Sequence, residues 1–262
     1  MNNSLRKAFE TDGYITNKNF LSLQDKRMIA NVIYEEFHDE IGIKNKKDFT
    51  IEGQEFHDKL ITLRKNNPKI FGKIYDRIML NAKLRSIFYT KKMLKNFSTI
   101  LNTKVENIYL NGFMCRFDAP NEDRNSLEWH QDAPYYLETY PKMNAGVCWM
   151  AVTKNSSKNG TLIYIPRSHH KIIKPNSFKK DKFHSEQKKI VISKNELLNK
   201  KNLNVSFGDV SFMHMNLKHR SGENSSKKFR ITLGCRFHDM KSSFNTGYEQ
   251  YVFHDRKILN LF

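Results

Sequence analysis

Two histidines, one aspartate and one arginine have the types and spacing of a metal-dependent enzyme. One residue separates His130 from Asp132, so in an extended segment both side chains point to the same side and can bind one ion. A second histidine, His219, follows much later, and two imidazoles with one carboxylate form the ligand set of non-haem Fe(II) oxygenases. Arg230 is permanently charged and forked, so it can hold a carboxylate-bearing cosubstrate. The first interpretation is an iron enzyme that activates O2.

Each part of this set is a weak signal alone. A His-x-Asp pair occurs by chance in many chains, and a structural histidine is commoner than a metal ligand. His214 is the alternative to His219, but the polar turn at 221–226 that follows His219 favours the latter. The adjacent His169 and His170 are expected to be structural or exposed.

The elements that must position these residues change character along the chain. Residues 4–100 are predicted to be mainly helical. Apolar residues recur at helical spacing after Ser22 and over 58–63, 69–80 and 84–101, and a short strand is expected near 14–16. From about residue 105 onward, strands are expected. They cover 107–117, 146–152, 161–165, 189–192, 209–213 and 229–237. This pattern predicts an α+β protein with a mainly β core, such as a jelly roll, and N-terminal helices packed on the sheet.

Composition excludes several other classes of protein. The 262 residues are 39% hydrophobic and 12% aromatic, which is enough for a substantial core. We expect no transmembrane helix and no secretory signal, because no long apolar run is present. Cys115, Cys148 and Cys235 form no C-x-x-C pair and are expected to be buried free thiols. A reducing cytoplasm fits these thiols and a ferrous ion, so a cytoplasmic location is expected.

The net charge of +18 comes from 45 basic and 27 acidic residues. It allows an acidic partner, such as nucleic acid, an anionic membrane surface or a phosphorylated substrate. It also fits a solvated, lysine-rich surface, which we favour because the basic clusters at 44–47, 179–189 and 194–201 lie in loop-like stretches without regular aromatic residues. An anionic small molecule is the next interpretation.

Short motifs surround the candidate ligands in an order that is specific as a set. They are His130-Gln131-Asp132, Asn159-Gly160-Thr161-Leu162, Ile165-Pro166-Arg167-Ser168-His169, Phe207-Gly208-Asp209, and His219-x-Ser221-Gly222-x-Asn224-x-Ser226 followed by Arg230. The chain resembles the phytanoyl-CoA dioxygenase family, well over 109–237 and more loosely toward the N-terminus. That family comprises Fe(II)- and 2-oxoglutarate-dependent oxygenases built on a double-stranded β-helix, a jelly-roll variant. Arg167 stands where the family usually has glycine.

The resemblance implies one domain over residues 1–262. Residues 1–104 would be its mainly helical part, 105–240 its jelly-roll core and 241–262 a C-terminal extension. It also implies that His130, Asp132 and His219 bind the iron, with O2 and 2-oxoglutarate as cosubstrates. Arg230, with Ser221 beside it, would hold the distal carboxylate of 2-oxoglutarate.

Further positions are candidates for lining the site. Gln131 and Trp149 match positions that line the cosubstrate pocket, although a linker glutamine and a core tryptophan are the alternatives. Arg116 can face an anionic substrate or the surface. Tyr135 and Tyr136 follow the metal motif and either line the substrate channel or only pack.

The leading hypothesis is a hydroxylase acting on an unactivated C–H bond of a small or carrier-linked organic substrate, with 2-oxoglutarate converted to succinate and CO2. The positive charge mildly favours an anionic substrate. Asp132 disfavours halogenation, because alanine or glycine there would open a halide site.

Two alternatives remain: a non-catalytic jelly-roll binding module, and a nucleic-acid oxidative demethylase, which would need a base-stacking pocket. Nucleic acid is not the expected partner, and the sequence leaves substrate and oligomeric state open.

Overall fold

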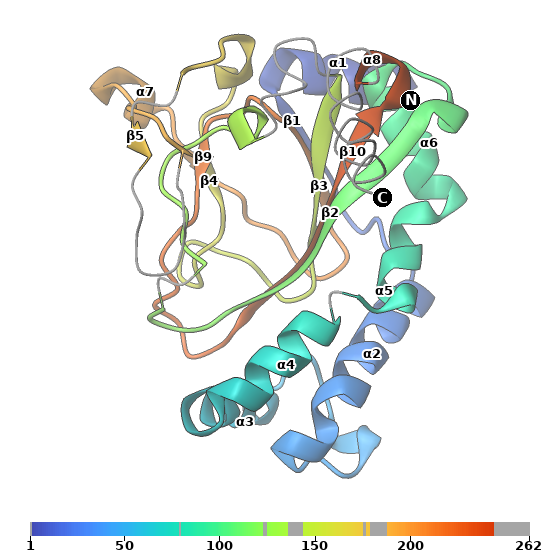
Figure 1. The fold of residues 1–262 in the computed structure, drawn as a ribbon, viewed down its shortest axis with the longest axis vertical. Coiled ribbons are helices and arrows are strands. Elements are labelled where there is room, and N and C mark those ends of the chain that lie inside the picture. Colours follow the sequence, from blue (N-terminus) through green and yellow to red (C-terminus); the bar gives the residue numbers. More distant parts are fainter. Residues whose placement is uncertain are drawn as a thin grey trace, which may run out of the picture.

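A computed structural model describes residues 2–78, 80–122, 125–135, 144–174, 177–178 and 188–243 (Figure 1). Tyr136 and residues 244–262 of the C-terminal extension lie outside this part. The N-terminal part is helical, as expected. Its helices are α1 (Asn2–Asp12), α2 (Leu23–Ile41), α3 (Gln54–Asn66), α4 (Pro68–Ile78), α5 (Ala82–Ser86) and α6 (Lys91–Leu101), with 3-10 turns η1 (Lys46–Asp48), η2 (Ile87–Tyr89) and η3 (Val105–Asn107).

Capping residues set the ends of the main helices. Ser22 and Asp25 form a capping box at the start of α2, and Gly42 ends that helix in the left-handed conformation. The prediction of a single helix over 84–101 was wrong. The chain forms α5 and η2 first, and α6 begins after Thr90, whose hydroxyl accepts a hydrogen bond from the Met93 amide.

The strands form two main antiparallel sheets. The larger has the order β1 (Tyr14–Asn17), β8 (Val210–His214), β3 (Ala145–Ala151), β10 (Arg230–Asp239) and β2 (Ile108–Asp118). The smaller has the order β7 (Lys201–Asn202), β4 (Ile163–Tyr164) and β9 (His219–Arg220), and β5 (Ser177–Phe178) pairs separately with β6 (Lys188–Lys189). The strand expected over 189–192 reduces to β6. The remaining short helices are η5 (Ser168–His170), α7 (Lys194–Leu198) and α8 (Met240–Ser243).

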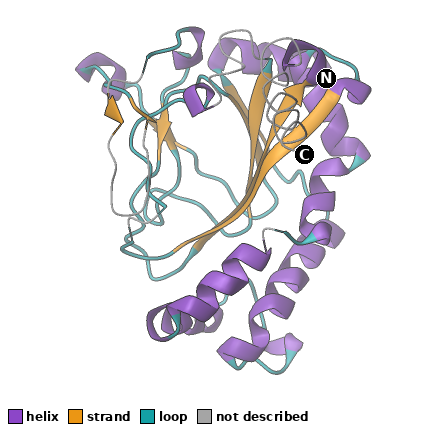
Figure 2. Ribbon diagram, in the orientation of Figure 1, coloured by secondary structure: helices purple, strands orange, loops and turns teal. Residues whose placement is uncertain are grey.

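Successive side chains of β10 point to opposite faces of the large sheet, and this alternation separates two layers of the molecule. Ile231, Leu233 and Phe237 join the main apolar core, which also contains residues of the N-terminal helices. The intervening Arg230 and Arg236 contact segments on the opposite face of the sheet, toward the smaller sheet. Figures 1 and 2 show the helices along one side of the large sheet and the small sheet on its other side. The expected jelly roll with helices packed on its sheet is confirmed.

The expectation of buried free cysteines agrees with the structure. Cys115, Cys148 and Cys235 are buried free thiols. Within the described ranges, no helix combines the length and apolar character needed to cross a membrane.

Candidate metal centre

Two backbone hydrogen bonds bring the distant halves of the candidate metal site together. The amide of His130 donates to the carbonyl of His219 at 2.9 Å, and the amide of His219 donates to the carbonyl of His130 at 3.0 Å. The segment that carries His130 and Asp132 therefore extends the small sheet next to β9. This pairing puts residues from two remote parts of the chain at one place.

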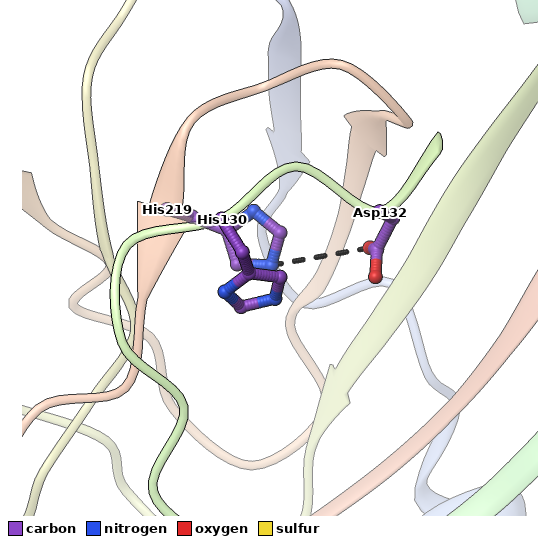
Figure 3. A group of neighbouring side chains, drawn as sticks. All are labelled: His130, Asp132 and His219. Atoms are coloured by element: carbon purple, nitrogen blue, oxygen red, sulfur yellow. Dashed lines mark ion pairs between the residues drawn. The ribbon is translucent and has the colours of Figure 1, made fainter. Parts of the chain in front are cut away.

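The side chains of His130, Asp132 and His219 converge (Figure 3). One potential ligand atom from each lies within 4.8 Å of the other two. The imidazole centroids are 4.1 Å apart, and Asp132 Oδ2 is 3.9 Å from His219 Nε2. All three residues are buried. Among the described residues, this is the group of histidine, cysteine and acidic side chains that gathers closely enough for one metal ion.

Hydrogen bonds fix which atoms face the centre. Nδ1 of His130 lies 2.6 Å from the carbonyl oxygen of Glu128, and Nδ1 of His219 lies 2.8 Å from that of Leu217. Because a carbonyl can only accept, each Nδ1 carries a proton, and Nε2 is the ring atom of each histidine that a metal can use. The donor set therefore offers one Nε2 atom from each imidazole and one carboxylate.

The electrostatics of the site keep His130 and Asp132 in the state that a metal requires. Burial, reinforced by His219, lowers the pKa of His130 to about 3. Burial alone would raise the pKa of Asp132, but Arg236 and the two histidines outweigh it and the pKa is lowered. At neutral pH the site therefore holds a neutral His130 and an ionised carboxylate, which fits a divalent ion.

His214, the alternative ligand, lies elsewhere. Its Nδ1 accepts a hydrogen bond from the Asn216 amide at 3.0 Å, and its ring centroid is 5.0 Å from that of His169. His169 is buried and its Nε2 donates to the carbonyl of Glu10 at 2.9 Å. His170 is exposed. These contacts agree with structural or surface roles.

Arg230 is buried and paired with an aspartate that the sequence did not reveal. Nε of Arg230 donates to Asp118 Oδ2 at 3.0 Å, NH2 donates to the same oxygen, and NH1 donates to the carbonyl of Gly160. Arg116 contacts the other oxygen of Asp118 at 3.2 Å and also donates to the carbonyl of Asn125. Burial would raise the pKa of Asp118, but the two arginines outweigh it and the pKa is lowered.

Ser221 belongs to the same polar network. Its hydroxyl accepts from the Leu127 amide at 3.1 Å and lies 3.5 Å from the carbonyl oxygen of Asn125, which Arg116 also contacts. Gly160 accepts from Arg230 and has φ +76°, where an added Cβ would lie 2.8 Å from backbone atoms of Gly222 and Asn224. Arg230 thus lies in a tightly built polar network.

Gln131 is fully buried and ties backbone segments together. Its Nε2 donates to the carbonyls of Lys171 and Asn216, and its Oε1 accepts from the Ile173 amide at 2.9 Å. Its role beside the cosubstrate therefore stays a prediction, while the three contacts show a structural role.

Two aromatic candidates, Trp149 and Tyr135, belong to the described residues. Trp149 belongs to an apolar cluster that also contains Ala133, next to Asp132. The Tyr135 ring stands edge-on to that of His130, with centroids 6.0 Å apart, and its hydroxyl accepts from the Lys188 amide at 2.9 Å. Contact of either side chain with cosubstrate or substrate stays a prediction, and Tyr136 is outside the described residues.

Arg167 adopts the left-handed conformation that a glycine would favour, with φ +63°. Its amide donates to the carbonyl of Asp12 at 2.9 Å, and its Nε donates to the carboxylate of Asp12 at 3.0 Å. The departure from the family motif is therefore accommodated by contacts to α1.

Comparisons with known proteins agree with this geometry. The model of the phytanoyl-CoA dioxygenase (PhyH) family matches residues 9–232. Peroxisomal phytanoyl-CoA dioxygenase from Bos taurus is 25% identical over 246 residues, covering 89% of this chain and 67% of that protein. The Homo sapiens protein of the same name is 24% identical over 247 residues, covering 88% and 67%.

Solved structures share the fold at low identity. EctD from S. alaskensis with bound Fe has a TM-score of 0.61 at 14% identity, covering 91% of this chain and 77% of that chain. The non-heme monooxygenase ThoJ in its apo form has a TM-score of 0.58 at 18% identity, covering 90% and 77%. These two likenesses extend over the helical part as well as the sheets.

Proposed function

The chain belongs to the phytanoyl-CoA dioxygenase family of Fe(II)- and 2-oxoglutarate-dependent oxygenases, and we propose that it hydroxylates a C–H bond of a small or carrier-linked organic substrate. The enzyme class follows from the family. The observation that carries the assignment to this site is the buried convergence of His130, Asp132 and His219.

We propose that these three side chains hold Fe(II) through the Nε2 atoms and the carboxylate. Two imidazoles and one carboxylate leave positions for a bidentate 2-oxo acid and O2. When bound, the iron supplies O2 activation coupled to conversion of 2-oxoglutarate to succinate and CO2. The hydrogen bonds to the Glu128 and Leu217 carbonyls keep the two rings oriented for this task.

Arg230 is the proposed partner of the distal carboxylate of 2-oxoglutarate. A guanidinium has five N–H donors, and the contacts to Asp118 and Gly160 use three of them. One donor then remains on each terminal nitrogen, which suits the two oxygens of a carboxylate. Asp118 would hold the guanidinium by its side, and Ser221 would lie beside the bound carboxylate. Trp149 is proposed to form part of the wall of this cosubstrate pocket.

The two alternatives differ from this proposal in measurable ways. A binding module would hold no iron and form no succinate. A nucleic-acid demethylase would bind single-stranded oligonucleotide in a salt-dependent way. The cytoplasmic location stays a prediction, and the bovine and human relatives are named as peroxisomal proteins.

The test begins with protein loaded with Fe(II) without oxygen, then given 2-oxoglutarate and O2. We expect iron-dependent formation of succinate, and mass spectrometry of a cell extract should show a product that has gained one oxygen atom only when iron and 2-oxoglutarate are both present. His219→Ala should abolish both signals. Failure of the wild-type protein to bind iron or form succinate with any extract would overturn the proposal.

A further inference from the structure

The side chain of Thr232 is buried next to Arg230 on the inner face of the large sheet. Thr232 lies two residues after Arg230 on β10, so the two side chains point to the same face. The intervening Ile231 packs in the main apolar core on the opposite face. Thr232 is 1% exposed, and its Oγ1 has no hydrogen-bond partner among the described residues. The sequence analysis did not single out this residue.

Strand register puts Thr232 at one corner of a block of four side chains. β2 and β10 lie side by side (Figure 1), with Asp118 opposite Arg230 and Arg116 opposite Thr232. Asp118 binds both arginines, since its Oδ1 lies 3.2 Å from Arg116 NH2 and its Oδ2 lies 3.0 Å from Arg230 Nε. On the other side, Thr232 lies opposite Ala151 of β3, whose methyl group offers no polar atom. Ion pairs thus join three corners of the block, and the hydroxyl at the fourth is left unbonded.

An unpaired buried hydroxyl is unfavourable within the folded chain. Burying a hydroxyl without a hydrogen bond costs free energy, and native proteins leave few buried polar groups unpaired. Packing alone does not require this hydroxyl, because valine has nearly the same shape as threonine. We therefore expect the hydroxyl of Thr232 to find its partner in a molecule that the site binds.

The neighbouring groups indicate the chemistry of that partner. Arg230 keeps one N–H donor on each terminal nitrogen after its bonds to Asp118 and to the carbonyl of Gly160. The hydroxyl of Thr232 can supply a third donor on the same face of the sheet. A carboxylate only accepts hydrogen bonds and has about four lone-pair sites for them. These three donors therefore suit one carboxylate group.

We propose that Thr232 Oγ1 donates a hydrogen bond to the distal carboxylate of 2-oxoglutarate, beside the two bonds from Arg230. The inference rests on the proposed function, in which Arg230 holds that carboxylate. Thr232 is then a cosubstrate-binding residue that favours a dicarboxylic 2-oxo acid. Arg116 has a structural part in this arrangement, because it binds Asp118, and its contact with an anionic substrate stays a prediction.

The experiment measures the binding of 2-oxoglutarate to Fe(II)-loaded protein by calorimetry without oxygen. Thr232→Val removes the hydroxyl and keeps the shape, so the Kd should rise roughly tenfold to a hundredfold, the effect of one hydrogen bond to a charged group. Thr232→Ser keeps the hydroxyl and should bind nearly as tightly as the wild type. Iron affinity should be unchanged in both variants. In succinate formation, Thr232→Val should raise the KM for 2-oxoglutarate and leave kcat near the wild-type value, because the contact is the same in the ground state and the transition state.

Urea denaturation of the metal-free protein gives a readout that does not depend on the reaction. Thr232→Val should leave the urea midpoint unchanged or raise it, because a methyl group replaces an unpaired hydroxyl. Thr153→Val is the matched control, since Thr153 is equally buried but its Oγ1 accepts a hydrogen bond from the Ile231 amide at 2.9 Å. That substitution leaves a buried amide unpaired and should lower the midpoint.

These measurements separate the outcomes. Weaker binding of 2-oxoglutarate by Thr232→Val, without loss of stability, supports the proposal. Wild-type affinity in Thr232→Val would overturn it, as would an equal loss of affinity in Thr232→Ser, which would assign the effect to packing. A fall in the midpoint of Thr232→Val as large as that of Thr153→Val would also overturn it, because the hydroxyl would then have a partner within the protein.

Failure of this inference is distinguishable from failure of the proposed function. If the wild type and Thr232→Val bind iron and 2-oxoglutarate equally well, the proposed function stands and only the role of Thr232 is wrong. If the wild type binds neither iron nor 2-oxoglutarate, the proposed function itself fails, and this inference fails with it.

Discussion

Asp118 of β2 and Arg230 of β10 lie opposite each other in register and form a buried ion pair, with Arg230 Nε 3.0 Å from Asp118 Oδ2. The other oxygen of Asp118 contacts Arg116, so one carboxylate separates two guanidinium groups. This arrangement holds Arg230 in place before any cosubstrate arrives. It fixes the guanidinium that we propose to bind the distal carboxylate of 2-oxoglutarate.

Removing the charge of Asp118 should destabilise the fold. Asp118→Asn leaves the buried Arg230 and the half-buried Arg116 without their carboxylate, and breaking a buried pair typically costs about 3–5 kcal/mol. Urea denaturation should show this loss in the free energy of unfolding. The control is Glu36→Gln, which removes the carboxylate partner of the exposed Arg77 and should cost under about 1 kcal/mol. Equal losses in the two variants would contradict a special role for Asp118.

The forked guanidinium of Arg230 should be needed for tight binding of 2-oxoglutarate. Arg230→Lys keeps a positive charge but cannot offer two parallel donors, so the KM for 2-oxoglutarate should rise about tenfold to a hundredfold. Succinate formation at varied 2-oxoglutarate concentration measures this. Iron affinity should stay near the wild-type value, and an unchanged KM would show that another residue holds the distal carboxylate.

Gly160 should tolerate no side chain. Gly160→Ala would bring a Cβ to 2.8 Å from backbone atoms at a positive φ, and it would disturb the carbonyl that Arg230 contacts. We expect a loss of roughly 1–3 kcal/mol in unfolding free energy together with weaker 2-oxoglutarate binding. Gly42→Ala is the matched control, because Gly42 has a similar φ of +66° but no atom within 4 Å of the added Cβ. A comparable loss at Gly42 would mean that backbone strain alone is responsible.

The candidate metal ligands could be predicted from the sequence because their signal is local. His130 and Asp132 share one extended segment, and His219 is marked by the motif that follows it. The layer structure was also predictable, since the apolar period changes near residue 105. The basic stretch at 194–201 was expected to be loop-like, but it contains α7. The sequence does carry a signal for this helix, because Ser193 and Glu196 form a capping box at its start.

Asp118 and Arg236 could not be found in this way, because their roles depend on strand register. Asp118 lies 112 residues from Arg230, and the strand expected over 107–117 stopped one residue before it, whereas Asp118 is the last residue of β2. Arg236 contacts Asp132 across 104 residues of chain. The alternation of side chains along one strand does not show which face of the sheet lies toward the metal site. Only the pairing of β10 with its neighbouring strands reveals these contacts.

Acid should destabilise the protein through its buried histidines. His57 is fully buried, its Nδ1 accepts from the Phe229 amide, and burial lowers its pKa from 6.5 to about 4. Between these two values the unfolded chain binds more protons than the folded one, so stability falls as pH falls through this window. For His57 alone the loss is roughly 2–3 kcal/mol near pH 4.5. Thermal denaturation of His57→Gln between pH 7.5 and 4.5 should show a shallower decline than the wild type, and parallel curves would exclude this contribution.

The most direct test of the proposed centre is an Fe(II) titration without oxygen, followed by 2-oxoglutarate and O2. We predict one Fe(II) per wild-type chain and iron-dependent succinate. His219→Ala should weaken iron binding at least about a hundredfold, whereas His214→Ala should bind iron like the wild type. If His219→Ala keeps its iron while His214→Ala loses it, or if the wild type binds none, the site formed by His130, Asp132 and His219 is not the metal centre.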